Sequence, residues 1–229
     1  MDVAVVTVGD ELLAGDIENT NATWLCRQLT DRGVDVRRVF VLPDDRATIA
    51  QEVNEARADY DAVIVTGGLG PTHDDVTMAA VADAVGRDLV EHPEAAASLD
   101  DRGYGPGTRT PKTAYLPAGA RALHNEVGVA PGAVLASIYV FPGVPAEMKA
   151  MFKTVAEEFT GESRYQELVE TSEPERHLVD RLTQLRERFP VTVGSYPGET
   201  VRVKITGPDE TAVADAAAWF RERVESPST

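Results

Sequence analysis

The order of apolar and polar residues along the chain predicts strands that alternate with helices. Continuous apolar runs rich in β-branched residues occupy residues 3–9 (VAVVTVG) and 61–65 (DAVIV), which is typical of strands buried on both faces of a parallel sheet. Residues 34–43 form a further predicted strand, and helical spacing runs over residues 19–32 and 46–58. This alternation predicts an α/β fold with a mostly parallel sheet and right-handed crossovers.

The last third of the chain follows a different order of elements. After a predicted strand within residues 132–145 and a helix over residues 145–159, the pattern predicts a strand, a helix, two strands and a final helix between residues 165 and 224. This β-α-β-β-α order predicts a second, smaller α+β domain. We therefore expect a first domain over residues 1–160 and a second domain over residues 161–229.

The chain is strongly acidic. Its 229 residues include 38 Asp and Glu against 22 Lys and Arg, for a formal net charge of −16. Such an excess of acids is typical of proteins from salt-loving organisms, where high ionic strength screens the self-repulsion. No basic stripe could follow a nucleic-acid backbone, and no apolar run has membrane-spanning length. We expect a cytoplasmic protein without a nucleic-acid or membrane partner, and the single cysteine excludes an internal disulfide.

A glycine-rich turn follows the strand that ends near residue 65, in the segment VTGGLGPTHDDVT (residues 65–77). Gly67, Gly68 and Gly70 allow positive φ and leave their backbone amides open to a ligand. Thr72 is a candidate cap for the helix predicted over residues 74–86, whose first amides would bind an anion. The segment lacks the Gly-Lys-Ser/Thr of a Walker loop, and His73 stands where a dinucleotide fingerprint needs its third glycine. The turn therefore predicts a phosphate site of another kind.

Two adjacent acids, Asp74 and Asp75, leave two interpretations of this turn open. In one, Asp75 completes a Thr-x-x-Asp helix cap and interacts with the helix dipole. In the other, the acids hold a divalent cation such as Mg²⁺, which bridges carboxylate to phosphate and offsets their repulsion of an anionic ligand. The second interpretation predicts a metal-assisted phosphoanhydride site.

Polar residues and turns also follow the other predicted strands. Glu11, Asn19 and Asn21 come after the first strand, Asp44 after the second, and Gly143 lies in a proline-containing turn after a later one. Each could serve only as a helix cap or a turn. Because parallel strands end at one edge of a sheet, we expect these residues to gather beside the glycine-rich turn.

Four segments together resemble a known family. GDELLAGDIENTNATWL (residues 9–25), TGGLGPTHDDVT (66–77), HNEVGVAPG (124–132) and FPGVPAEM (141–148) are similar, in order and spacing, to the molybdopterin-binding domain of MoaB/Mog type, and specifically to its CinA-like branch (competence/damage-inducible protein A). The resemblance covers residues 3–159 and implies a three-layer, mostly parallel sheet. The second domain is similar to the small KH-type domain of CinA proteins. Because the chain ends at Thr229, we expect it to lack their C-terminal nicotinamide-mononucleotide deamidase domain.

The resemblance also implies roles for individual residues. Gly67, Gly68, Gly70 and Thr72 would hold a phosphate or pyrophosphate. Asp44 and Asp75 fall where relatives place acids that serve magnesium and catalysis. Asp74 is a further candidate metal ligand, and Glu11 a further catalytic candidate. The other positions that match ligand-lining loops are Asn19, Asn21, Asn125, Pro131, Gly132, Pro142, Gly143 and Pro145.

The activity that CinA-like proteins imply is metal-dependent hydrolysis of ADP-ribose-like pyrophosphates. We therefore predict a nucleotide pyrophosphatase that uses Mg²⁺ or a similar divalent metal. Two alternatives stay open: adenylyl transfer onto molybdopterin in molybdenum cofactor biosynthesis, or a non-catalytic module that binds a pterin or nucleotide. In each case the partner is a small-molecule nucleotide or pterin phosphate. Related domains self-associate, so we expect a homo-oligomer, either a dimer or a trimer.

Overall fold

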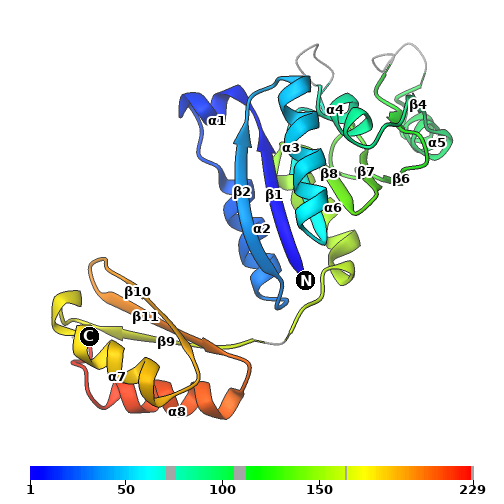
Figure 1. Cartoon of the computed structure of the whole chain (residues 1–229). Helices are drawn as coiled ribbons and strands as arrows, with labels where there is room; N and C mark the ends of the chain where they lie inside the picture. The colour runs from blue at the N-terminus through cyan, green and yellow to red at the C-terminus, as the bar shows by residue number, and fades with distance from the viewer. Residues whose placement is uncertain (71–75, 106–111, 163, 228–229) are drawn as a thin grey trace. The chain divides into compact units, whose positions relative to one another are not determined.

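A computed structural model of the whole chain describes residues 1–70, 76–105, 112–162 and 164–227. The chain divides into two compact units, Met1–Gly161 and Glu162–Thr229, and Figure 1 shows the elements of each. In the residues described, no helix is long and apolar enough to cross a membrane.

The first unit is built on a six-stranded sheet in the order β2-β1-β3-β8-β7-β6. Its strands are β1 (Asp2–Val8), β2 (Asp35–Leu42), β3 (Ala62–Thr66), β6 (Arg121–Leu123), β7 (Gly132–Leu135) and β8 (Ile138–Phe141). The four strands β2, β1, β3 and β8 are parallel, whereas β6 and β7 pair antiparallel at one side. The predicted mostly parallel α/β sheet is confirmed.

Helices cover both faces of this sheet and give three layers (Figure 1). The unit's helices are α1 (Asp10–Ala14), α2 (Thr20–Thr30), α3 (Arg46–Asp59), α4 (Thr77–Ala84), α5 (Pro93–Asp101) and α6 (Pro145–Val155), with a 3₁₀ turn, η1 (Ala156–Glu158). Alternate residues of β1 point to opposite faces. Val5 packs with Leu25 of α2 and Phe152 of α6, whereas Val6 packs with Ile49 of α3. A small two-stranded antiparallel sheet of β4 (Leu89–Glu91) and β5 (Tyr115–Pro117) completes the unit.

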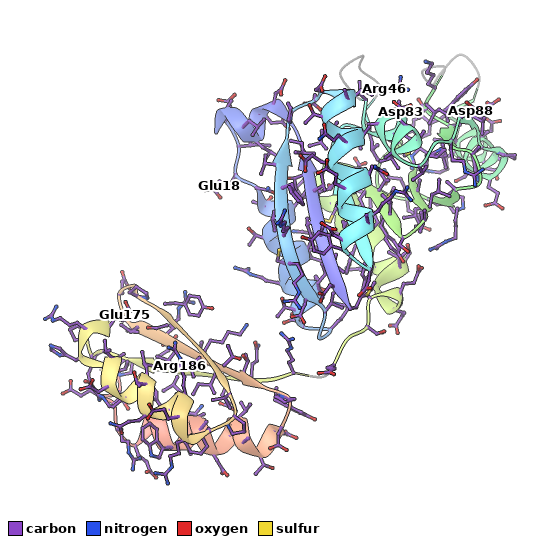
Figure 2. All side chains as sticks on the ribbon, viewed as in Figure 1. Glu18, Arg46, Asp83, Asp88, Glu175 and Arg186 are labelled. Atoms are coloured by element: carbon purple, nitrogen blue, oxygen red, sulfur yellow. The ribbon has the colours of Figure 1, made fainter. Side chains whose placement is uncertain are left out.

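An ion pair ties α3 to α4. Arg46 Nε lies 2.6 Å from one carboxylate oxygen of Asp83, and Nη2 lies 2.7 Å from the other. Figure 2 labels both side chains, Arg46 at the upper end of α3 and Asp83 on α4. The contact is bidentate but more than two fifths exposed on each side, so it adds little to stability.

The strand order creates a switch point beside β1. β1 lies between β2 and β3. The crossover from β1 to β2 therefore runs in one direction along the sheet, and the crossover from β2 to β3 runs back past β1 in the other. A crevice forms at the carboxyl ends of strands where such a reversal occurs, and ligands of open α/β sheets bind there. Thr7 of β1 and Thr66 of β3 are register partners at this edge.

The second unit contains an antiparallel sheet in the order β10-β11-β9. Its elements are β9 (Tyr165–Thr171), a 3₁₀ turn η2 (Glu175–His177), α7 (Val179–Arg188), β10 (Thr192–Tyr196), β11 (Val201–Gly207) and α8 (Glu210–Arg221). Val203 and Ile205 of β11 pack with Leu185 of α7 and Phe220 of α8. The predicted β-α-β-β-α order is therefore found.

An ion pair fastens the end of α8 to the rest of the second unit. Arg181 Nη1 lies 2.8 Å from Glu173 Oε1, which also accepts the backbone N–H of Glu225 at 2.9 Å. The bonds from Arg181 lower the pKa of Glu173 to about 2, because they favour its ionised form.

Candidate functional site

The described residues form a pocket at the switch point of the first unit. Its volume is about 80 Å³, which would hold roughly five to eight water-sized groups and fits a phosphate. The exits of three parallel strands meet there, from β1, β3 and β8. Glu18, labelled in Figure 2, contributes to the rim. The lining residues are Thr7, Val8, Glu11, Leu12, Ile17, Glu18, Asn19, Thr20, Asn21, Thr66, Gly67, Gly143 and Pro145.

Two threonine hydroxyls lie at the ends of the strands that bound the pocket. Thr7 and Thr66 are 1% and 2% exposed, although the runs around them are otherwise apolar. Thr7 Oγ1 donates to Phe40 O at 3.0 Å, and Thr66 Oγ1 donates to Pro142 O at 2.7 Å. Sequence analysis did not select either residue, because threonine is also an ordinary β-strand residue.

Asn19 and Asn21 reach the pocket from the start of α2. Asn19 caps this helix, accepting the N–H of Ala22 at 3.0 Å, while its Nδ2 donates to Thr7 Oγ1 at 2.9 Å. Asn21 Nδ2 donates to Gly143 O at 2.6 Å and lies 3.4 Å from Thr66 Oγ1. Both asparagines that the sequence selected are thus brought to the pocket, and Asn19 also performs the capping role that was the alternative interpretation.

The glycine-rich turn lies against the end of β1. Gly67 has φ +109°, and a Cβ there would meet Val8 O at 2.1 Å. Gly68 has φ +63°, and its Cβ would lie 2.3 Å from Thr77 Oγ1. A third close approach joins Gly143, whose Cβ would lie 3.3 Å from the Cα of Gly67. Packing alone therefore requires glycine at Gly67.

The start of the following helix differs from the prediction. Helix α4 begins at Thr77, Val76 holds its N-cap position without a side-chain cap, and the Thr77 N–H bonds Gly68 O at 3.3 Å. Because Val76 and not Thr72 holds the N-cap position of α4, the prediction that Thr72 caps this helix is wrong. The predicted roles of Thr72, Asp74 and Asp75 toward phosphate and metal fall outside the described residues. Gly70, the third glycine of the predicted phosphate-binding turn, is exposed.

Asp44 lies beside the glycine-rich turn, as the edge argument predicted. Its Oδ2 accepts the N–H of Asp10 at 3.0 Å, and Asp10 Oδ1 accepts the N–H of Asp44 at 3.3 Å. A Cβ on Gly68 would lie 3.5 Å from Asp44 Oδ1. The neighbouring Asp45 caps α3 by accepting from the N–H and the hydroxyl of Thr48, and these bonds lower the pKa of Asp45.

The carboxylate of Glu11 belongs to the pocket itself. It folds over the strand exit so that a Cβ on Gly9 would lie 2.6 Å from Glu11 Oε1. The residues that the structure describes contain no group of three or more His, Cys, Asp or Glu placed to hold a metal ion. Of the three predicted metal ligands, Asp44 is the one within the described ranges.

Asn125 lies outside this pocket lining and forms hydrogen bonds within the loop over residues 125–130. Its Nδ2 donates to Glu147 Oε2 at 2.6 Å, and its Oδ1 accepts the N–H of Gly128 at 2.7 Å. Arg102 donates to the backbone carbonyl of Gly128 at 2.6 Å. Pro131 and Gly132, which follow, are buried, and a Cβ on Gly132 would lie 2.4 Å from Val140 O. These contacts provide structural reasons for the residues, and their predicted ligand contacts stay predictions.

Comparisons with known proteins agree with this geometry. Residues 4–161 match the model of the probable molybdopterin-binding domain. A protein of Archaeoglobus fulgidus is 38% identical over 97% of each chain, and one of Pyrococcus furiosus is 35% identical over 97% of each chain. The solved structure of CinA from Thermoplasma acidophilum, described as a protein of unknown function, has a TM-score of 0.65 and 38% identity over 69% of this chain and 97% of its own. The chain therefore belongs to the family of the probable molybdopterin-binding domain and is CinA-like.

Proposed function

We propose that this protein is a metal-dependent nucleotide pyrophosphatase that acts on ADP-ribose-like substrates. The observation that supports the proposal is the phosphate-sized pocket at the switch point. There the hydroxyls of Thr7 and Thr66, the backbone of Gly67 and the carboxylate of Glu11 line one hollow. Thr20 and Asn21 at the start of α2 belong to the same lining, and the first turn of a helix favours phosphoryl oxygens. A carboxylate at the same place can take up a proton.

The charge around the pocket favours a cation as part of the site. Glu11 and Glu18 line it, and Asp44 lies beside the adjoining turn, so an anionic ligand would be repelled without compensation. The carboxylate of Asp44 is a hard oxygen donor of the kind that Mg²⁺ prefers. We propose that Asp44, together with Asp74 and Asp75 of the glycine-rich segment, holds this ion. When bound, it would draw charge from the pyrophosphate and make a water molecule more acidic.

The side chains then divide the hydrolysis between them. The Asp10 N–H fixes the carboxylate of Asp44 in one orientation. Glu11 accepts a proton from a water molecule whose oxygen attacks phosphorus. The anhydride P–O bond breaks as the new one forms, and ADP-ribose yields AMP and ribose 5-phosphate. The glycine-rich turn stabilises the charge that develops on the phosphoryl oxygens.

The test is AMP release from ADP-ribose in MgCl₂, followed by chromatography. Asp44→Asn keeps an oxygen for the Asp10 N–H but loses the charge, and we expect the rate to fall at least roughly a hundredfold. Asp45→Asn is the matched control: Asn is as good an N-cap as Asp, so its rate should stay within about twofold. An Asp44→Asn variant that releases AMP at the wild-type rate would overturn the proposal.

A second candidate function is adenylyl transfer onto molybdopterin, which the family's description as a probable molybdopterin-binding domain favours. It uses the same pocket with another acceptor. Mass spectrometry after incubation with molybdopterin and Mg-ATP separates the two, because an adenylylated pterin forms only in this reaction. Binding of ADP-ribose or the pterin without any turnover would instead identify a non-catalytic module.

We also propose that the chain works in the cytoplasm as a dimer or trimer, and at high salt. The acid excess of the sequence supports the last point. Light scattering coupled to size exclusion measures the assembly, and a monomer at micromolar concentration would contradict it.

A further inference from the structure

Two buried oxygen atoms without a hydrogen-bond partner flank the glycine-rich turn. Across the part of the chain that the structure describes, three buried side-chain atoms lack a partner: Asn21 Oδ1, Thr77 Oγ1 and Ser195 Oγ. Ser195 belongs to the second unit, whereas the other two lie beside Gly67 and Gly68. Native proteins satisfy nearly all such groups, so each exception needs an explanation.

Thr77 is the more buried of the two at this turn. It is 0% exposed and is the first residue of the eight-residue helix α4. Its hydroxyl points at the turn, because a Cβ on Gly68 would lie 2.3 Å from Thr77 Oγ1. A valine would fill the same volume without leaving a polar atom unpaired. The hydroxyl therefore weakens the ligand-free protein, and packing does not explain it.

Asn21, which lines the pocket together with Gly67, gives the same indication. Its Nδ2 faces the carbonyl oxygen of Gly143 at 2.6 Å, and a carbonyl accepts only a donor, so the amide orientation is fixed. Its Oδ1 is then left without a partner among the described residues. Two unpaired groups near one turn indicate that the turn has another arrangement in which they are paired.

We propose that Thr77 is a ligand-binding residue whose hydroxyl donates a hydrogen bond to a phosphoryl oxygen of the ligand. Gly67 and Gly68 both have positive φ, and successive glycines change conformation at low cost. A shift of Gly68 uncovers the hydroxyl at the start of α4, where the helix dipole also favours negative charge. The ligand class rests on the proposed function, whereas the unpaired hydroxyl does not.

The experiment compares Thr77→Val with Thr77→Ser. Urea unfolding measures the ligand-free protein, and calorimetry measures affinity for ADP-ribose and inorganic pyrophosphate in MgCl₂. We expect Thr77→Val to unfold at a higher urea concentration than the wild type and to bind about tenfold more weakly. Thr77→Ser keeps the hydroxyl and should bind within about threefold of the wild type. Ser195→Ala is the matched control, because it removes the third unpaired oxygen without changing affinity.

Each other outcome has a definite meaning. A Thr77→Val protein that is less stable than the wild type would show that the hydroxyl is already paired, and the inference would fail. The inference also fails if Thr77→Val is more stable and binds as tightly as the wild type, or if the wild type binds neither ligand. Ligand binding with the expected loss in Thr77→Val but no AMP release would overturn only the proposed hydrolysis.

Discussion

Gly67→Ala should destabilise the first unit more than any strain at the glycine itself can explain. The new Cβ would lie 2.1 Å from Val8 O and 3.1 Å from Val8 C, both backbone atoms at the end of β1. Strain at φ +109° costs about 1–3 kcal/mol. Forcing a methyl group against a backbone that cannot rotate away costs about another 1–3 kcal/mol. We therefore expect a loss of about 4 kcal/mol, a large part of the roughly 5–15 kcal/mol of a typical domain.

The assay is urea unfolding followed by the fluorescence of Trp24, which packs edge-on against Phe152 in the first unit at 5.5 Å between ring centroids. A Trp219→Phe background removes the signal of the second unit. Gly86→Ala is the matched control, because Gly86 has φ +63° and no atom within 4 Å of its added Cβ. It should lose only about 1 kcal/mol.

The difference between the two variants isolates the contact with Val8. If Gly67→Ala lost no more stability than Gly86→Ala, the close approach of the turn to β1 would not exist. The pocket built on that approach would then have to be abandoned.

Three further predictions concern pH, salt and the Asn125 loop. The pKa of Glu173 is lowered from 4.5 to about 2, so the ionised carboxylate stabilises the second unit fully above about pH 4.5, and this stability is lost as the pH falls through 2. Urea unfolding followed by Trp219 fluorescence should show a smaller loss at low pH for Glu173→Gln, and an unchanged pH dependence would contradict this prediction. With a net charge of −16, the protein should gain stability between low and molar KCl as repulsion is screened, and a melting temperature that falls would refute this. Asn125→Ala leaves the Glu147 carboxylate and the Gly128 N–H without their partner and should lower the free energy of unfolding by about 2–4 kcal/mol. Wild-type stability would show that Asn125 does not hold its loop. The ADP-ribose affinity of the same variant decides whether Asn125 also contacts the ligand.

The main elements of the fold could be predicted because burial leaves a clear pattern. Runs such as residues 3–9 are rich in β-branched residues, which is typical of a strand covered on both faces. The hairpin of β7 and β8 was missed, and a single strand was predicted there. Its turn places Ala136 and Ser137 at φ 50° and 62°. Glycine or asparagine at these positions would have predicted a hairpin turn. The short helix α1 spans five residues, too few to show a helical period.

The candidate site could be predicted only where residue type and function coincide. The glycines at positions 67 and 68 predict a positive φ, and Asp44 is an acid directly after a strand, where ligands of parallel sheets bind. Thr7 and Thr66 gave no such signal, because threonine is also an ordinary β-strand residue. The structural partners of Asn125 are Arg102 and Glu147, and only the tertiary structure brings them together.

The most direct test of the account is a crystal structure of the protein with ADP-ribose and Mg²⁺. The account predicts a phosphoryl group in the pocket, within hydrogen-bond distance of the backbone at Gly67 and of the side chains of Thr7 or Asn21. A nucleotide bound at any other surface, with this pocket closed by the protein's own atoms, would contradict it.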